Sequence, residues 1–124
     1  MACVFCEKDQ QEIVLENQWV KAFFDHFPVQ RGHLLIVPKR HVPTYFDATP
    51  EEIQAIDDLL RKGKELLDET YHPDGYNIGV NVGEWGGQTI MHLHVHLIPR
   101  YQGDVPNPRG GIRNAIPNLV PYDG

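Results

Sequence analysis

The run His92-Leu93-His94-Val95-His96-Leu97-Ile98-Pro99 carries the strongest signal for the fold. Its histidines alternate with apolar residues, and alternate side chains of a β-strand point to the same face of a sheet. We therefore expect a strand over residues 90–98 with the three histidines on one face and Leu93, Val95 and Leu97 in the core. Adjacent positive charges repel one another, so this arrangement favours neutral imidazoles, which act as nucleophiles, bases or metal ligands.

Four further strands are expected outward from this run. Residues 12–24 favour two short strands broken near Asn17, because they are rich in aromatic and β-branched residues. Residues 33–37 predict a buried strand that ends at Pro38, and residues 76–82 predict another strand.

One helix stands out between these strands. In Thr49-Pro50-Glu51-Glu52, the threonine suits the N-cap, the proline suits the first helical position, and Glu52 completes a capping box. Apolar residues then recur at helical spacing as far as Tyr71. The order of elements predicts an α+β fold, a five-stranded antiparallel sheet with one main helix. An exposed sheet edge in so small a domain favours a homodimer.

Composition narrows the class of protein. The 124 residues suit a single domain over 1–124, with a core over about 3–101 and a Pro- and Gly-rich tail over 102–124. The net charge of −6 argues against a stable nucleic-acid partner. We expect neither a membrane span nor a secretory signal, so the predicted localisation is cytoplasmic.

Two chemical interpretations of the three histidines compete. They suit a catalytic zinc site with three histidine ligands, or nucleophilic attack on phosphorus by one histidine. The preceding Gly86-Gly87-Gln88-Thr89 offers backbone N–H groups, an amide and a hydroxyl, which suit phosphate oxygens. This neighbourhood favours the second interpretation.

At this point the sequence resembles the histidine triad (HIT) superfamily. Residues 87–100 (GQTIMHLHVHLIPR) are similar to its signature, in which three histidines alternate with apolar residues. Residues 25–42 (DHFPVQRGHLLIVPKRHV) and 77–83 (NIGVNVG) resemble further stretches of that family. The similarity is to a bacterial branch related to diadenosine polyphosphate hydrolases and Hint-type proteins. It implies a nucleotide hydrolase or transferase that needs no cofactor for catalysis.

The resemblance implies roles for two of the three histidines. His94 would attack the α-phosphorus of a dinucleoside polyphosphate or nucleoside phosphoramidate, forming a nucleotidyl-histidine that water hydrolyses. His96 would contact the phosphate and assist the leaving group. A zinc-dependent hydrolase and a non-catalytic nucleotide-binding regulatory protein remain the alternatives, and the preferred leaving group is not specified by the sequence.

The resemblance also implies four substrate-binding residues. Gln88 and Thr89 would hold phosphate or bridging oxygens, Asn81 would lie near the phosphate, and Asp25 would bind the ribose hydroxyls. We expect His33 to be explained by packing alone, and His26 and His72 to be surface residues. The cations expected to be solvated are Lys39, Arg40 and Arg100.

The pair Cys3-x-x-Cys6 favours metal or redox chemistry over a structural disulfide in a cytosolic chain. It is similar to a pair found in bacterial HIT members that bind one structural zinc. The resemblance implies that Cys3, Cys6, His41 and His92 form a closed tetrahedral zinc site. A redox pair or two unlinked thiols are the alternatives.

Overall fold

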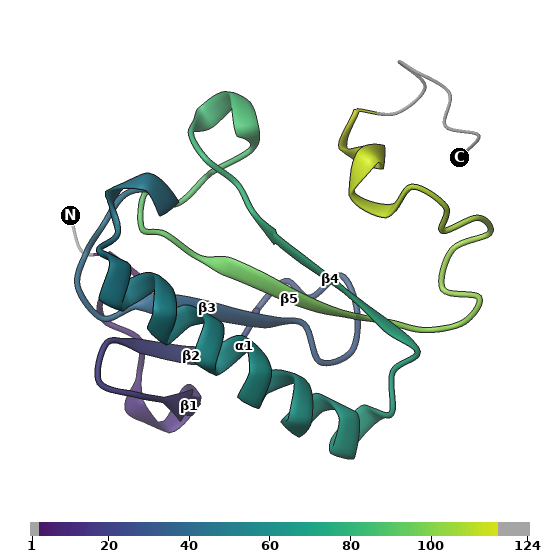
Figure 1. Cartoon of the computed structure of the whole chain (residues 1–124), viewed down its shortest axis with the longest axis horizontal. Helices are drawn as coiled ribbons and strands as arrows, with labels where there is room; N and C mark the ends of the chain where they lie inside the picture. The colour runs from purple at the N-terminus through teal and green to yellow at the C-terminus, as the bar shows by residue number, and fades with distance from the viewer. Residues whose placement is uncertain (1–2, 117–124) are drawn as a thin grey trace.

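The computed structural model describes residues 3–116 and has two layers, a five-stranded antiparallel sheet and a long helix that covers one of its faces (Figure 1). The order across the sheet is β1-β2-β3-β5-β4. The elements are β1 (Ile13–Glu16), β2 (Val20–Phe24), β3 (Leu34–Pro38), α1 (Pro50–Tyr71), β4 (Gly75–Val80) and β5 (Val95–Arg100). The predicted fold class is confirmed.

The capping box predicted at the start of α1 is present. Thr49 Oγ1 accepts a hydrogen bond from the backbone N–H of Glu52 at 3.1 Å, and Glu52 Oε1 accepts one from the N–H of Thr49 at 2.9 Å. The buried Glu52 also pairs with Arg40 Nη2 at 2.8 Å, which contributes to a lowered pKa of Glu52. Arg40 is therefore an ion-paired residue that ties the segment after β3 to the helix, and the expectation that it is only solvated was wrong.

The sheet has an apolar cluster on each face. Leu34, Ile36 and Leu97 face α1 and pack against its buried side. Gly63 allows this close approach, because a Cβ there would lie 2.9 Å from Leu34 Cδ2. A smaller cluster on the opposite face contains Phe5, Phe23, Leu35 and Val37. The first residues of the described chain thus lie on the face that α1 leaves open.

The last strand differs from its predicted bounds. β5 begins at Val95, where Ile36 and Val80 are its partners, and it continues to Arg100. Before Val95 the chain makes other hydrogen bonds in place of the backbone pairing between strands. His92 Nε2 lies 2.8 Å from the carbonyl of Pro38, and the N–H of Leu93 donates to the carbonyl of Val42. The predicted alternation still holds, because Leu93 is fully buried in the cluster that faces α1.

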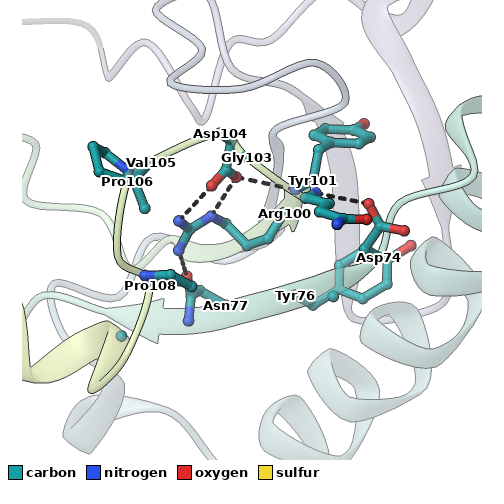
Figure 2. A pocket seen from close by; sticks show the side chains of 13 residues that line it. Asp74, Tyr76, Asn77, Arg100, Tyr101, Gly103, Asp104, Val105, Pro106 and Pro108 are labelled. Carbon is teal, nitrogen blue, oxygen red and sulfur yellow. Dashed lines mark hydrogen bonds and ion pairs between the residues drawn. The ribbon is translucent and has the colours of Figure 1, made fainter.

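The chain after β5 is attached to the sheet by Arg100. Its guanidinium donates to both carboxylate oxygens of Asp104, at 2.8 and 2.9 Å, and to Asn77 Oδ1 at 2.6 Å (Figure 2). Hydrogen bonds from Arg100 lower the pKa of Asp104. Arg100 is thus paired, against the expectation of a solvated charge. The described tail contains a short 3-10 helix at Gly111–Ala115, and the part expected over residues 117–124 lies outside the described residues.

The groups around Arg100 line a pocket of about 430 Å³ beside β4 and β5 (Figure 2). Its polar groups are largely committed to one another, and none of the three alternating histidines lines it. Within residues 3–116, no helix is long and apolar enough to cross a membrane.

Candidate active site

A pocket of about 290 Å³ opens on the sheet face away from α1. His94 and His96 lie in its wall, and residues from the N-terminal segment, β2 and the loop before β5 complete it. Those that matter for the chemistry below are Phe5, Lys8, Phe23, Asp25, Asn81 and Thr89. The pocket therefore brings together residues that are more than 90 positions apart in the chain.

The ring of His94 is held in one tautomer. Its Nδ1 lies 2.8 Å from the backbone carbonyl of His92. A carbonyl only accepts hydrogen bonds, so Nδ1 carries the hydrogen and Nε2 of the neutral ring carries the lone pair. The ring is 8% exposed and packs edge-on against Phe5, with centroids 5.0 Å apart. A single nucleophilic nitrogen is thus oriented by the backbone two residues upstream.

His96 is held in the opposite tautomer by a chain of hydrogen bonds. The N–H of Val29 donates to His33 Nδ1 at 3.2 Å, so the neutral ring of His33 carries its hydrogen on Nε2. That Nε2 lies 2.9 Å from His96 Nδ1 and 3.5 Å from Asp25 Oδ2. His96 Nδ1 therefore accepts, and its Nε2 keeps a hydrogen to donate. The two pocket histidines offer one acceptor and one donor.

Burial favours the neutral form of two of these rings, His96 and His33. Desolvation, with smaller effects from His33 and His94, lowers the pKa of His96 to about 4. Desolvation also lowers the pKa of His33, against the opposing effect of the Asp25 carboxylate. The direction for His96 agrees with the sequence-based expectation of neutral imidazoles among the three alternating histidines.

His33 is a part of the site that sequence reasoning missed. It is 3% exposed, as packing would require, but its ring also lies against that of His96 with centroids 5.1 Å apart. The signal available was alternation, since His33 precedes Leu35 by two residues and Leu35 pairs with His96 across the sheet. Alternation alone could not place His33 beside His96, because their proximity also depends on the register of β3 against β5.

The expected substrate-binding residues divide into two groups. Asp25, Asn81 and Thr89 all line the pocket. Asp25 Oδ1 accepts from the N–H of Phe27 at 2.9 Å, so this carboxylate caps a turn and still faces the pocket. Asn81 lies next to Gly87, since a Cβ added to this glycine would be 3.7 Å from Asn81 Cγ.

Gln88 lies elsewhere. It is 4% exposed and does not line this pocket. Its amide N–H groups donate to the carbonyls of Pro43 and Ile90, at 2.7 and 3.0 Å, and its Oε1 accepts from the N–H of Gly83. In this structure Gln88 braces the loop that carries Thr89 toward the pocket.

The four expected metal ligands lie together beside the pocket. One ligand atom from each of Cys3, Cys6, His41 and His92 lies within 4.8 Å of the others. His92 Nδ1 is 3.3 Å from both sulfurs, and His41 Nδ1 is 3.3 Å from Cys6 Sγ. Tetrahedral bonds of about 2.3 Å to sulfur and 2.0 Å to nitrogen separate such ligands by about 3.5 Å.

The outer contacts of His92 suit metal binding as well. Its Nε2 donates to the carbonyl of Pro38, so Nδ1 keeps its lone pair toward the sulfurs. Burial and the neighbouring Cys3 raise the pKa of the Cys6 thiol, so a bound cation would be needed to hold Cys6 as a thiolate ligand at neutral pH. The group could bind a metal, and its donor set fits zinc.

The three alternating histidines do not form one metal site. Among residues 3–116, the clusters of possible ligands are this one and a second of Asp25, His33 and His96. Each contains one of the three histidines, and His94 belongs to neither. The geometry therefore argues against a catalytic zinc held by His92, His94 and His96.

The chain is an α+β domain in which two oriented histidines, His94 and His96, lie in a pocket on the open face of the sheet. The family model described as HIT domain matches residues 7–103, so the chain belongs to the HIT family. The chain is similar to a HIT family protein from Bacillus anthracis of known crystal structure. That match has a TM-score of 0.76 and 37% identity, and covers 82% of this chain and 75% of that one.

Two further matches bear on chemistry. The bis(5'-nucleosyl)-tetraphosphatase [asymmetrical] of Schizosaccharomyces pombe is 37% identical over 67% of this chain and 46% of that protein. A Zn-bound histidine triad family protein from Mycobacterium smegmatis has a TM-score of 0.75 and 32% identity, over 84% of this chain and 78% of that one. Nucleotide hydrolase or transferase activity is thereby supported for the family as a whole.

Proposed function

We propose that this protein is a nucleotidyl hydrolase or transferase that cleaves at the α-phosphate of dinucleoside polyphosphates or nucleoside phosphoramidates. The observation that carries the proposal is the hydrogen bond from His94 Nδ1 to the carbonyl of His92. It leaves Nε2 as the nucleophile in a pocket whose other histidine offers a donor.

In the first step His94 Nε2 attacks the α-phosphorus, and the bond from phosphorus to the leaving group breaks. The imidazole becomes positively charged, and the carbonyl of His92 stabilises that charge through the Nδ1 hydrogen. His96 Nε2–H donates to the phosphate or to the leaving oxygen, where negative charge increases. A polyphosphate leaves as an anion, and an amine leaving group takes a proton from solvent.

In the second step water attacks the nucleotidyl-histidine, and His94 leaves as a neutral imidazole while the surplus proton passes to solvent. Asn81 and Thr89, which line the pocket beside His94, are the side chains we assign to the phosphate oxygens. Gln88 supports this arrangement by holding the loop before β5.

The nucleoside would lie along the rest of the pocket. The Asp25 carboxylate suits the ribose hydroxyls, because it accepts two hydrogen bonds. Phe5 and Phe23, with ring centroids 5.5 Å apart, provide an aromatic wall against which a base can pack.

We further propose that Cys3, Cys6, His41 and His92 hold one structural zinc. A closed set of two sulfurs and two nitrogens leaves no position for substrate, so the ion would stabilise the fold and take no part in the reaction. It would fix His92, whose carbonyl orients His94.

A substrate panel tests the proposed activity. Product release is measured from a diadenosine polyphosphate and from an adenosine phosphoramidate, with and without a chelator in a short preincubation. Turnover of either substrate that survives brief chelation supports the proposal. Binding without turnover would identify a nucleotide-binding regulatory protein, and immediate loss on chelation would identify a metal-dependent hydrolase.

A further inference from the structure

Lys8 places a cation in the apolar part of the pocket. Its side chain is 5% exposed, and its Nζ lies over the ring of Phe23, 4.5 Å from the centroid. Phe23 is itself 1% exposed and packs against Phe5. Both aromatic residues and Lys8 line the same pocket as His94. A lysine ammonium is seldom placed so deeply without a short ion pair.

The ammonium has unused hydrogen-bonding capacity. Among residues 3–116 its nearest carboxylate oxygen is Glu12 Oε2, at the long distance of 4.0 Å. The other oxygen of Glu12 is engaged by His26 Nε2 at 2.5 Å. An ammonium group has three N–H donors and no acceptor. Here they meet an aromatic face and a distant carboxylate, so a ligand acceptor entering the pocket would find a donor.

The contacts of Lys8 place it where the base is proposed to bind. Phe5 contacts both His94 and Phe23, with its ring centroid 5.0 Å from that of His94 and 5.5 Å from that of Phe23. Lys8 Nζ lies over the ring of Phe23, so it is next to the aromatic wall of the pocket. In the proposed function, on which this inference rests, that wall receives the nucleobase.

We propose that Lys8 makes the pocket select guanine nucleotides over adenine nucleotides. Guanine presents two adjacent acceptors, O6 and N7, whereas adenine presents the acceptor N7 beside the N6 amino donor. A group that only donates can bind both guanine atoms, but it meets the hydrogens of the adenine amino group. Discrimination then follows from one ammonium group at the edge of the base.

A purely structural role for Lys8 predicts a different result. If its ammonium serves only to cover the ring of Phe23, removing the charge changes stability and affects both nucleotides alike. Selection of a base predicts that the ratio of the two affinities changes. GMP and AMP share the same ribose and phosphate, so this ratio depends on the base alone.

The experiment is calorimetric titration of the intact protein with GMP and with AMP. We expect the wild type to bind GMP about tenfold more tightly than AMP, the discrimination typical of one good base contact. Lys8→Met keeps the apolar stem and loses the donors, so GMP should weaken about tenfold while AMP changes less than about twofold. Lys8→Arg keeps the donors and should keep a preference for GMP.

Lys39→Met is the matched control. Lys39 also pairs with a glutamate, Glu16, at 3.2 Å, but it lies outside the pocket, so the ratio should stay at the wild-type value. Melting curves confirm that each variant is folded. The wild-type comparison needs no variant and decides the question if Lys8→Met does not fold.

The outcomes separate this inference from the proposed function. Equal wild-type affinities for GMP and AMP, or an equal loss of both affinities in Lys8→Met, would overturn the role of Lys8. The proposed function would still stand in that case if the protein turns over nucleotide substrates. A protein that neither binds the two nucleotides nor hydrolyses their phosphoramidates overturns both.

Discussion

His33 Nε2 lies 2.9 Å from His96 Nδ1, and this contact determines which nitrogen of His96 faces the pocket with a hydrogen. The contact joins β5 to the residue that immediately precedes β3, so the sheet register places it. His33 receives its own orientation from the N–H of Val29. The N–H of Val29, the ring of His33 and the ring of His96 thus form a hydrogen-bond chain that leads to the proposed phosphate position.

His33→Leu should lower kcat about 100-fold, the size of effect expected when one proton donor is misplaced. Without the N–H of His33, His96 is free to carry its hydrogen on Nδ1 and present a lone pair to the phosphate. His33→Gln is the matched variant, because its amide can accept from Val29 and donate to His96, and it should retain most activity. Steady-state kinetics of both decide this, and equal activity in the two variants would contradict it.

His94→Ala should remove turnover and leave nucleotide binding largely intact. The nucleophile forms the bond that defines the reaction, so its deletion costs far more than the loss of a contact. Titration with a nucleotide and single-turnover kinetics measure the two effects. A variant that keeps more than about a tenth of the wild-type kcat would show that His94 is not the nucleophile. Mass spectrometry after an acid-free quench should find a nucleotidyl adduct on His94 in the wild type.

The low pKa of His96 should make the fold sensitive to acid. Its pKa is about 4 in the folded protein, and that of an unfolded histidine is about 6.5. Between these values the unfolded chain binds more protons, so this contribution is complete above the higher value and falls as the pH drops toward the lower. From about pH 7 to about pH 5, His96 should account for about 2 kcal/mol of lost stability.

Urea unfolding at the two pH values measures this loss. His96→Asn carries no titrating ring, so its stability should fall less than that of the wild type over the same range. Titrating groups that do not contact His96, including the cysteine and histidine cluster, are present in both proteins, so their effects cancel in the difference, which reports His96 together with its partner His33. An equal fall in the two proteins would contradict the assignment of acid sensitivity to His96.

Much of the site followed from alternation in the sequence. Leu93, Val95 and Leu97 are buried as predicted, and the Thr49 capping box starts the helix at the predicted residue. Both features are local, so a short stretch of sequence contains the information. The predicted cluster of Cys3 with His92 came from resemblance to a family, because no local pattern links residues 89 positions apart.

The features that were missed depend on which strands become neighbours. The start of β5 shifted because His92 donates through its side chain to Pro38, a choice that strand propensity does not encode. The buried position of Gln88 arises because three backbone groups from separate segments meet there. Sequence reasoning gave Lys8 no role, because its position over Phe23 depends on how the N-terminal segment packs against β2.

The homodimer remains a prediction, and the structure suggests which edge would form it. β1 has four residues and an irregular register, features that protect an edge strand. β4 at the other edge has six residues, and its Ile78 is 53% exposed. Sedimentation at micromolar concentration should therefore give twice the 14.2 kDa chain mass.

Ile78→Lys should shift the sedimentation result toward the monomer, because a charge at a buried strand edge opposes pairing. Val14→Lys changes a residue on β1 that is 38% exposed and serves as the matched control. The control should remain dimeric. A wild-type protein that sediments only near the chain mass would refute the dimer itself.

Elemental analysis of protein purified without added metal should find one zinc per chain. The thiolates of Cys3 and Cys6 belong to the N-terminal segment, whereas His41 follows β3 and His92 precedes β5, so the ion would fasten that segment to the sheet. Metal that binds only the folded state adds stability, and the addition falls at acidic pH as the ligands bind protons. Without the ion, the first residues should fray as unfastened termini do.

Cys3→Ser should consequently lower the melting temperature more than it lowers kcat. Activity under a chelator should decline slowly, following the loss of structure, because the closed site leaves no position for substrate. His72→Asn alters a histidine outside the cluster, at the left-handed end of α1 where asparagine is tolerated, and its zinc content should equal that of the wild type. Zinc far below one equivalent, together with cysteines that react freely with a thiol reagent, would show that Cys3 and Cys6 are a passive pair.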